Sequence, residues 1–339
     1  MANDTPFIIG MRDAYFDELY KIFQADPNAV FITADNGAPT LDKFASDMPD
    51  QYYQVGIAEQ QLFGLATGLA TEGRQVYTYA IMPFVTLRPA EFVKLDQCAV
   101  NLPIINIGVG AGFSYDIMGP THHTVEDIAL MRAFPNLTIW SPSDAKLAAE
   151  LAHVAHAIKT PQYIRFDRAG IPVLYPELDK MDADLKKRWW EDGMVNAHDT
   201  CENQDDYVEG DMSDVTIVAT GRFVHQAIQV ANHLWDKKRV TANVIDVFRL
   251  KPFNYDVFLN LVGGGAVVTY EEHQLAGGLG SIVLEAENDA AHIGLEEKYP
   301  ILRLGVPDKF TFDMGGREVI WKKYGLDPES AAERILAWL

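Results

Sequence analysis

The sequence predicts an α/β protein with two domains, each a mostly parallel sheet flanked by helices. Short runs rich in β-branched residues alternate with helical periodicity over residues 8–170, and the same alternation returns from residue 214 onward. Strands that alternate with helices indicate βαβ units and therefore parallel sheets. The chain has 339 residues, the length of two ordinary domains, and 48% of them are hydrophobic, which allows two sizeable cores.

In the first domain, residues 1–175, strands and helices are expected to alternate along the chain. The strands are expected at 29–34, 51–55, 75–79, 103–109, 137–141 and 162–166. The helices between them are expected at 12–24, 58–72, 89–100, 125–133 and 144–158. Ser143 stands directly before the last of these helices, and its hydroxyl can serve as the N-cap.

Periodicity is lost between the two domains. Residues 176–213 carry dense charge, as in HDTCENQDDYVEGDMSD, and we expect an acidic linker there. Trp189 and Trp190 could pin this linker onto a domain or a partner. In the second domain, residues 214–339, the expected strands are DVTIVATG, VTANVIDV, AVVTYEE and ILRLGV, and the expected helices are 224–235, 281–290 and 328–339.

Composition and charge exclude several classes of function. Lys and Arg number 28 against 48 Asp and Glu, so a net charge of −20 disfavours binding to nucleic acid or to an anionic membrane. Cys98 and Cys201 are the only cysteines and match no metal-binding or CxxC spacing, which favours a reducing compartment. The sequence has no signal-peptide pattern and no apolar run long enough to cross a membrane. We therefore expect a cytoplasmic protein.

The segment Gly56-Ile57-Ala58-Glu59-Gln60 places a carboxylate in the first turn of a helix that is otherwise small and apolar, LFGLATGLA. A helix this apolar is expected to be buried. A buried carboxylate is costly unless it is hydrogen-bonded or has a role that uses its proton. Glu59 is therefore a candidate catalytic residue, although a glutamate stabilised by the helix dipole is an equally good structural explanation from composition alone.

A second motif, Gly119-Pro120-Thr121-His122-His123, lies in a loop before the helix expected at 125–133. Together GIAEQ, the apolar helix, the aromatic segment TYAIMPFVTLRPAEF and GPTHH resemble the pyrimidine-binding half of transketolase-type thiamine-diphosphate (ThDP) enzymes. Deoxyxylulose-phosphate synthases and the β subunits of 2-oxoacid dehydrogenases share this layout. The resemblance runs through both domains, roughly 8–170 and 214–339, and implies that ThDP is the cofactor.

The resemblance implies roles for four residues at the cofactor. Glu59 matches the glutamate that hydrogen-bonds N1′ of the pyrimidine, which favours the tautomer of the 4′-amino group that removes the thiazolium C2 proton. Phe84 is our choice for the aromatic residue that stacks on the pyrimidine, and a core Phe is the alternative explanation. Asp35 and Ile57 lie in segments that resemble the family's cofactor loops, although aspartates are also common in turns.

The resemblance also implies a set of substrate-binding residues. His122 matches the histidine that handles protons on substrate oxygens, a role that suits imidazole because its ordinary pKa is close to working pH. Arg168 in YIRFDRAG matches an arginine that binds substrate phosphate through a bidentate fork better than Arg165 does. Arg88 is a further candidate for the phosphate, His123 is a further substrate-binding candidate, and surface ion pairs are the alternative explanation for all three arginines.

Two positions depart from the transketolase pattern. Transketolases have an Asp immediately before GPTH and a His eight residues earlier, and this chain has Met118 and Gly110 at those places. Asp116 and Tyr115 are close in sequence and could compensate, so Asp116 is included among the substrate-binding candidates. These departures indicate substrates other than ordinary pentose phosphates.

Half of the expected active site is absent from this sequence. Complete transketolases have a GDG…N motif whose Asp and Asn hold Mg²⁺ against the diphosphate, and this chain has no GDG triplet. We therefore expect no metal ligands in this chain. The resemblance implies a split enzyme, in which an N-terminal, diphosphate-binding subunit holds Mg²⁺ and shares ThDP, in an α2β2 heterotetramer with a large apolar interface that includes the Glu59 helix.

Four functions are compatible with the sequence. The leading hypothesis is transfer of a two-carbon ketol unit between phosphorylated or modified sugars. The alternatives are an acyloin-forming synthase with a 2-oxoacid donor, a 2-oxoacid dehydrogenase β subunit, and a non-catalytic relic, which Glu59 and His122 argue against. In the second domain, residues 277–281 (GGLGS) do not match Walker or Rossmann spacing, so we expect a structural role there, while His273 could reach the partner's active site.

Overall fold

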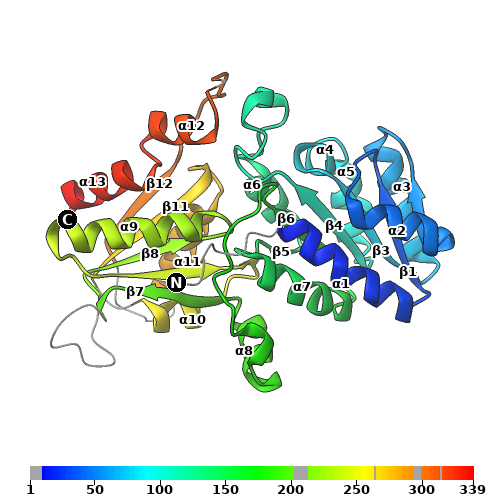
Figure 1. The fold of residues 1–339 in the computed structure, drawn as a ribbon, viewed down its shortest axis with the longest axis horizontal. Helices are drawn as coiled ribbons and strands as arrows, with labels where there is room; N and C mark the ends of the chain where they lie inside the picture. Colours follow the sequence, from blue (N-terminus) through cyan, green and yellow to red (C-terminus); the bar gives the residue numbers. More distant parts are fainter. Residues whose placement is uncertain (1–9, 202–212, 263–264, 293–298, 314) are drawn as a thin grey trace, which may run out of the picture. The chain divides into compact units, whose positions relative to one another are not determined.

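The structure of the protein is a computed structural model, which describes residues 10–201, 213–262, 265–292, 299–313 and 315–339 (Figure 1). The chain divides into two compact units. The first contains the residues up to Tyr115 together with Thr121–Met181, and the second contains Asp116–Pro120 together with Asp182–Leu339. Each unit has a mostly parallel sheet flanked by helices, so the predicted fold class is confirmed.

The strands of the first unit run parallel to one another in the order β5-β6-β4-β3-β1-β2. Every residue of β1, β4 and β6 is buried, as is typical of a parallel sheet covered on both faces. All of the strands expected in this region are present, with small differences at their ends. Their bounds are β1 Ala29–Thr33, β2 Tyr52–Gln54, β3 Gln75–Ile81, β4 Ile104–Val109, β5 Thr138–Trp140 and β6 Gln162–Phe166.

The helices of the first unit include two that were not expected, α2 and α4, which are too short to show a clear helical period. The helix expected at 89–100 is instead α5 followed by a π-helical segment, Val93–Ala99. α1 and α7 pack side by side (Figure 1), and α3 packs against β3. The bounds are α1 Met11–Ala25, α2 Pro39–Asp47, α3 Glu59–Thr71, α4 Met82–Thr86, α5 Ala90–Phe92, α6 Asp127–Arg132 and α7 Ala145–Ala157.

The N-cap of α7 is Asp144 rather than Ser143, so that expectation was wrong by one residue. The Asp144 carboxylate accepts a hydrogen bond from the Leu147 N–H at 2.7 Å. Its other oxygen accepts from the N–H of Leu174 at 2.6 Å. The two oxygens of the carboxylate therefore accept from the helix start and from a distant backbone N–H at the same time.

The second unit has the strand order β12-β11-β8-β9-β7, in which only β7 is antiparallel to its neighbour within the described residues. The strands and helices expected here are present, and α10 and α12 are additional. The strands are β7 Met194–Asp199, β8 Val215–Ala219, β9 Ala242–Val247, β11 Ala266–Gln274 and β12 Ile301–Val306, with a short β10, Arg249–Lys251. The helices are α8 Ala183–Asp192, α9 Phe223–Lys238, α10 Tyr255–Leu261, α11 Leu279–His292, α12 Arg317–Tyr324 and α13 Pro328–Trp338.

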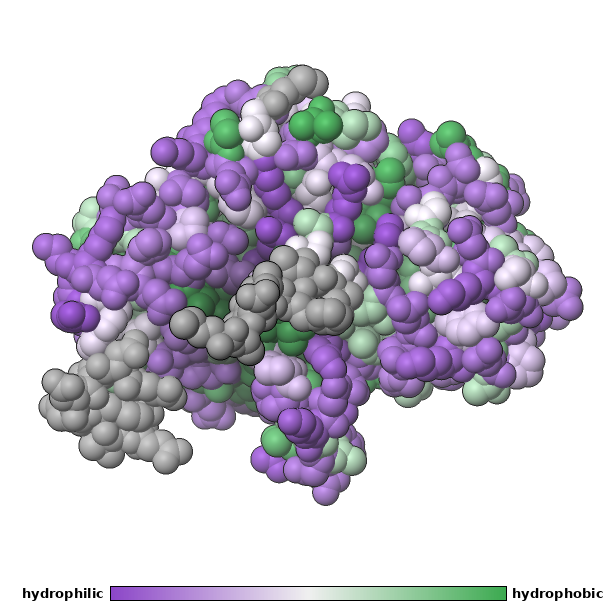
Figure 2. Space-filling view, in the orientation of Figure 1, coloured by the Kyte–Doolittle hydropathy of each residue, from purple (hydrophilic) through white to green (hydrophobic). Residues whose placement is uncertain are grey.

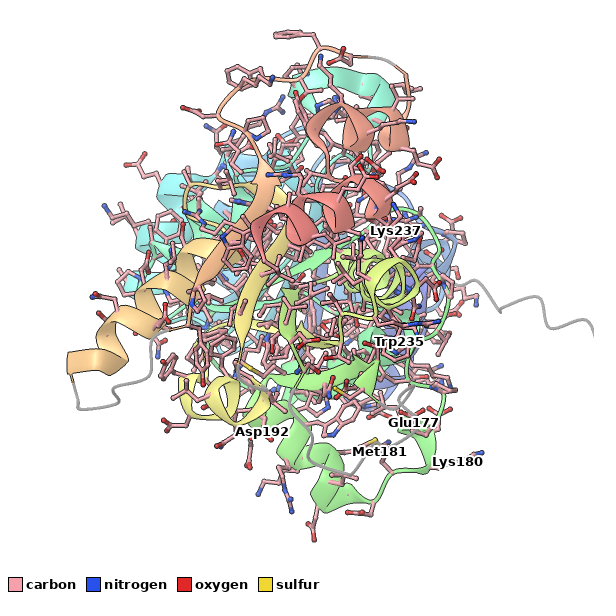
Figure 3. All side chains as sticks on the ribbon, turned by 90° about the vertical axis from the view of Figure 1, so that its left-hand side faces the viewer. Glu177, Lys180, Met181, Asp192, Trp235 and Lys237 are labelled. Atoms are coloured by element: carbon pink, nitrogen blue, oxygen red, sulfur yellow. The ribbon has the colours of Figure 1, made fainter. Side chains whose placement is uncertain are left out.

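Helices α9 and α13 pack against each other in the second unit. Lys237 at the end of α9, labelled in Figure 3, lies 3.3 Å from Glu333 and 3.5 Å from Glu329 on α13. These ion pairs are largely exposed, so the apolar contacts beneath them contribute most of the packing energy.

The segment 176–213, expected to be an acidic linker, contains α8 and β7 in its described part. The sequence of α8 is rich in charged residues because most of its surface faces solvent. Trp190 is its one buried side chain. Trp190 lies 5.2 Å from Phe248, between ring centroids, and so anchors α8 on the second unit. β7 is an edge strand whose pairing with β9 does not depend on apolar alternation. The stretch 202–212 lies outside the described residues.

The surface of the protein reflects its acidic composition. Most of the face visible in Figure 2 is hydrophilic, as expected for a chain with a net charge of −20. Among the described helices, none is both long and apolar enough to cross a lipid bilayer.

Candidate active site

Polar and aromatic side chains gather where the parallel strands of the first unit end. In open parallel sheets, ligands bind at this carboxyl edge because the loops that follow the strands meet there. The residues of interest are Asp35 after β1, Glu59 after β2, Phe84 and Arg88 after β3, Tyr115 and His122 after β4, and Arg168 after β6.

Glu59 is the first residue of α3 and is only 3% exposed. The burial expected for this carboxylate is therefore present. The expectation that the whole helix is buried was wrong, because Gly64 and Gly68 on the same helix are exposed. A Cβ added at either glycine would meet nothing within 4 Å, so this face of α3 is open in the described chain. The apolar sequence reflects one buried face and one face of very small residues.

Arg88 connects Glu59 to an aromatic ring. Its Nη1 donates a hydrogen bond to Glu59 Oε2 at 2.8 Å. Its guanidinium carbon lies 4.6 Å from the centroid of the Phe84 ring, which is a cation–π contact. The Arg88 side chain is 48% exposed, whereas that of Glu59 is 4% exposed. The structure thus places this arginine against the buried carboxylate.

Phe84 is held by close packing of α4 on β4. A Cβ on Gly108 would lie 2.9 Å from the Met82 side chain, so a glycine in the strand permits this approach. The buried Asn106 donates from Nδ2 to the carbonyl of Val85 at 3.1 Å, which ties α4 to the same strand. The position of the Phe84 ring is therefore set by the sheet.

His122 packs against Phe84. The two ring centroids are 5.1 Å apart at an interplanar angle of 76°. The Nδ1 atom of His122 lies 2.9 Å from the hydroxyl of Thr121. Burial lowers the pKa of His122 below its ordinary value of 6.5, so the imidazole is mostly neutral at pH 7. A neutral imidazole can both donate and accept a proton in this position.

Tyr115 completes the cluster and takes the place left by a missing side chain. Gly110 has φ +108°, and a Cβ there would lie 2.3 Å from the Tyr115 ring. The Tyr115 ring centroid is 5.8 Å from that of His122, and the Arg168 guanidinium lies 4.9 Å from the same tyrosine ring. The sequence indicated Tyr115 as a residue that could compensate for Gly110 and Met118, although it was not included among the predicted site residues.

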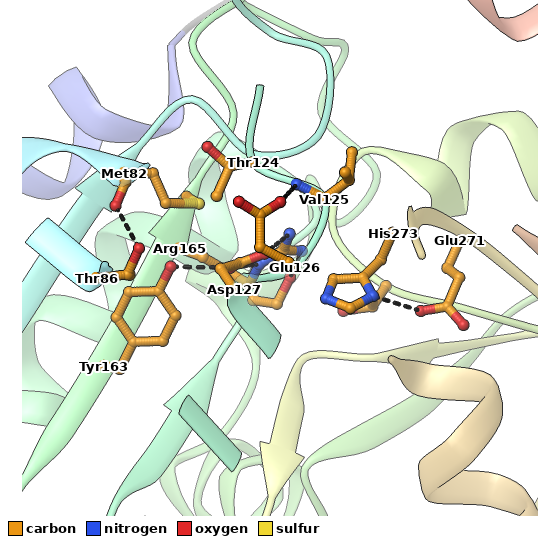
Figure 4. A network of polar contacts seen from close by, with 12 residues as sticks. Met82, Thr86, Thr124, Val125, Glu126, Asp127, Tyr163, Arg165, Glu271 and His273 are labelled. Atoms are coloured by element: carbon orange, nitrogen blue, oxygen red, sulfur yellow. Dashed lines mark hydrogen bonds and ion pairs between the residues drawn. The ribbon is translucent and has the colours of Figure 1, made fainter. Parts of the chain in front are cut away.

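Arg165 and His123 are buried and make structural contacts. Arg165 forms a two-point ion pair with Asp127, at 2.8 Å and 3.2 Å, and the hydroxyl of Tyr163 donates to the same carboxylate at 2.8 Å (Figure 4). His123 is 3% exposed and packs edge-to-face on Phe113 at 4.9 Å. Arg168, by contrast, is exposed.

The other predicted site residues make their described hydrogen bonds outside this cluster. Asp35 is exposed and accepts a hydrogen bond from Gln54 Nε2 at 3.2 Å. Ile57 is 75% exposed. Asp116 belongs to the second unit, where its carboxylate accepts from the Arg317 N–H at 2.9 Å. The structure therefore brings together Glu59, Arg88, Phe84 and His122, with Arg168 connected to His122 through Tyr115.

The glycine-rich turn of the second unit has a structural explanation. The Glu271 carboxylate accepts hydrogen bonds from the N–H groups of Leu279, at 2.6 Å, and Gly280, at 2.8 Å, at the start of α11. A Cβ on Gly278 would lie 2.1 Å from Glu271 Oε2, so only glycine lets this carboxylate reach the helix. His273 is 1% exposed, and its Nδ1 lies 4.0 Å from Glu271 (Figure 4).

The side chains around Glu59 are of the kinds that could hold an aminopyrimidine ring. The buried carboxylate of Glu59 could bond to a ring nitrogen, the aromatic face of Phe84 could stack on the ring, and His122 lies beside Phe84. In the part of the chain that the structure describes, no three His, Cys, Asp or Glu side chains are grouped so that they could hold a metal ion.

Comparison with known proteins agrees with the fold. The transketolase pyrimidine-binding domain family matches residues 8–172, and the transketolase C-terminal domain family matches residues 207–330. A subunit of the apulose-4-phosphate transketolase of Phocaeicola vulgatus is 31% identical over 341 residues, which cover 100% of this chain and 99% of that protein. The 1-deoxy-D-xylulose-5-phosphate synthase of Caldanaerobacter subterraneus is 34% identical over 96% of this chain, which spans about half of that protein (49%).

Among solved structures, a split-gene transketolase described as an inactive β4 tetramer has a TM-score of 0.76 and 29% sequence identity. The similarity covers 97% of each chain, so both units are included. The chain therefore belongs to the transketolase family and contains its pyrimidine-binding and C-terminal domains.

Proposed function

We propose that this chain is the cofactor-activating subunit of a split, ThDP-dependent transketolase-like enzyme that transfers a two-carbon ketol unit between sugar-like substrates. The observation that carries the proposal is the buried carboxylate of Glu59 in one cluster with Phe84 and His122. The relative from Phocaeicola vulgatus, which matches over nearly its whole length, is itself one subunit of a transketolase, and this supports the assignment to a subunit of an enzyme.

Each residue of the cluster has a proposed role. Glu59 hydrogen-bonds N1′ of the pyrimidine, and Phe84 supplies the face on which that ring stacks. Bound ThDP supplies a thiazolium carbon that makes and breaks carbon–carbon bonds beside a carbonyl. His122, with its lowered pKa, accepts and returns a proton at a substrate hydroxyl oxygen. The exposed guanidinium of Arg168 binds an anionic group of the substrate.

Four further predicted residues remain proposals. Asp35 and Ile57 are exposed beside the strand ends and are proposed to contact the cofactor. His123 and Asp116 are proposed to contact the substrate.

A second polypeptide is proposed to complete the site. We propose that an N-terminal-type transketolase subunit holds both the diphosphate and Mg²⁺, in an α2β2 assembly in the cytoplasm. The inactive β4 form of the similar split-gene transketolase supports the need for such a partner. The open face of α3, at Gly64 and Gly68, suits close helix packing because small residues let two backbones approach. We propose this face as part of the interface.

An acyloin-forming reaction with a 2-oxoacid donor is the second candidate, because the chain is 34% identical to a deoxyxylulose-phosphate synthase over 96% of its length. A donor screen with the reconstituted pair separates the two. We expect ketol transfer from ketose phosphates or modified ketoses, detected by mass spectrometry of both products, without release of CO₂. Release of CO₂ from pyruvate, with incorporation of its two remaining carbons into the product, would favour the second candidate.

A further inference from the structure

Arg88 contacts the two groups that the pyrimidine ring of the cofactor needs. We propose that Arg88 competes with the aminopyrimidine for Glu59 and Phe84, so that the cofactor binds only when this side chain moves away. The inference rests on the proposed function and deepens it, because it identifies a residue that controls access to the cofactor site.

The geometry of the competition follows from the chemistry of the two groups. A guanidinium and an aminopyrimidine are both planar, and both can hydrogen-bond a carboxyl group through their edge. The guanidinium donates its N–H groups, and the pyrimidine shares a proton between its ring nitrogen and the carboxyl oxygen. Arg88 already uses Glu59 Oε2, at 2.8 Å, and lies over the Phe84 ring, at 4.6 Å. A charge-assisted hydrogen bond and a cation–π contact together hold it there. Two planar groups cannot occupy one place over Phe84 while both bond to the same carboxylate oxygen.

Arg88 can move away from Glu59 without displacing the rest of the site. The Arg88 side chain is 48% exposed, and ion pairs with one exposed partner are weak. Phe84 lies on α4, which Gly108 and Asn106 fix to β4. The Arg88 side chain can therefore swing toward solvent without moving the ring on which the pyrimidine stacks.

Displacement of Arg88 would also affect the substrate. A guanidinium released from Glu59 becomes available for the anionic group of a substrate, the role that the sequence predicts for Arg88. Cofactor binding and substrate binding would then be coupled through one side chain. The apparent affinity for the cofactor is reduced by the fraction of time that Arg88 occupies the site.

The test measures binding of the pyrimidine part alone to the full-length chain without its partner. Calorimetric titration with 4-amino-5-hydroxymethyl-2-methylpyrimidine compares the wild type, Arg88→Met and the control Arg239→Met. Arg239 is a matched control because it also lies over an aromatic ring, that of Trp235, at 4.9 Å, and has no proposed role in the site. If Arg88 occupies the site for about 80–90% of the time, Arg88→Met should bind the pyrimidine roughly 5- to 10-fold more tightly, with Arg239→Met unchanged.

Equal or weaker binding by a folded Arg88→Met variant overturns the proposal, and so does an equal gain in the Arg239→Met control. Should Arg88→Met fail to fold, Arg88→Lys provides the test. It keeps a cation beside Glu59 but loses the planar group over Phe84, so tighter binding than wild type is expected here too, and equal or weaker binding overturns the proposal.

If the reconstituted pair is active but Arg88→Met binds the pyrimidine like wild type, the proposed competition by Arg88 is rejected and the proposed function is kept. If no variant binds the pyrimidine and the pair shows no ThDP-dependent turnover, the proposed function fails with it.

Discussion

Two buried carboxylates of the first unit each face an arginine, but their surroundings differ. Asp127 and Arg165 are both buried, and Tyr163 adds a third hydrogen bond to the same carboxylate. Glu59 is equally buried, whereas its partner Arg88 is about half exposed. The first pair is a closed structural network, and the second can open toward a ligand. This difference between the two pairs supports the catalytic role that we propose for Glu59 and a stabilising role for Asp127.

The first prediction concerns Glu59 itself. Glu59→Gln should lower turnover of the reconstituted enzyme by about 10³-fold or more, since the amide cannot share a proton with the pyrimidine nitrogen. Circular dichroism should remain unchanged. Glu72→Gln, at the exposed end of the same helix, should leave turnover intact. Retention of more than roughly a tenth of the wild-type rate by Glu59→Gln would refute the role, given that scale for acid–base catalysis.

The second prediction concerns Asp127. Asp127→Ala leaves the Arg165 guanidinium buried without its carboxylate, so it should destabilise the first unit by about 3–5 kcal/mol in urea unfolding. As a control, Glu191→Ala removes the exposed pair with Lys187 and should cost less than about 0.5 kcal/mol. A loss for Asp127→Ala no larger than that of the control would show that the network contributes little.

The third prediction concerns the titration of His122. Burial lowers its pKa in the folded protein below the ordinary 6.5, so the unfolded chain binds the proton at higher pH. The stability that depends on neutral His122 is therefore fully present above pH 6.5. It is lost as pH falls from 6.5 through the lowered pKa. Imidazole NMR should give a midpoint below 6.5 that is absent in His122→Gln, and a midpoint at or above 6.5 would contradict the burial.

At the scale of elements, replacing two different glycines by alanine should change the stability of the protein in opposite directions. Gly278→Ala places a Cβ 2.1 Å from Glu271 Oε2 and breaks the contact that caps α11, so it should destabilise the second unit by about 1–3 kcal/mol. Gly64→Ala adds a methyl group in open space on α3 and should stabilise the isolated chain by about 0.5–1 kcal/mol. Thermal unfolding of both variants checks this, and a stable Gly278→Ala would show that the cap is dispensable.

The elements that the sequence predicts well are those buried on both faces. Every residue of β1, β4 and β6 is buried, and β1 (AVFIT) and β4 (IINIGV) each contain a single polar residue, so these two runs stand out in the sequence alone. β7 and α8 were missed because their order depends on contacts distant in sequence, the β9 pairing and the Trp190–Phe248 contact. The cap at Asp144 was missed because its second hydrogen bond comes from Leu174, far along the chain.

The sequence named residues that the structure brings together in the candidate site, but it did not predict the contacts between their side chains. Glu59, Phe84 and His122 came from motifs in the sequence, and the structure places them together. The contact of Arg88 with Glu59 could not be foreseen, because it depends on the path of a long side chain between two segments that follow different strands. Tyr115 was named from the sequence as a residue that could compensate for Gly110, but only the structure shows that its ring lies against that glycine.

At the scale of the whole molecule, we propose that one active site is divided between two polypeptides. This chain supplies a buried carboxylate, a stacking ring and an imidazole, and the proposed partner supplies the groups that hold the diphosphate and Mg²⁺. The open face of α3 is where the two are proposed to meet. If the site is divided in this way, the assembly of both subunits should bind the cofactor tightly, and this chain alone should bind it weakly.

Calorimetric titration of ThDP in the presence of Mg²⁺ tests this claim directly. The titration is made into this chain alone, into a diphosphate-binding transketolase subunit alone, and into their equimolar mixture. We predict a dissociation constant in the micromolar range, about −8 kcal/mol, for the mixture and binding at least about 100-fold weaker for this chain alone. Binding by this chain alone that equals binding by the mixture would contradict the account.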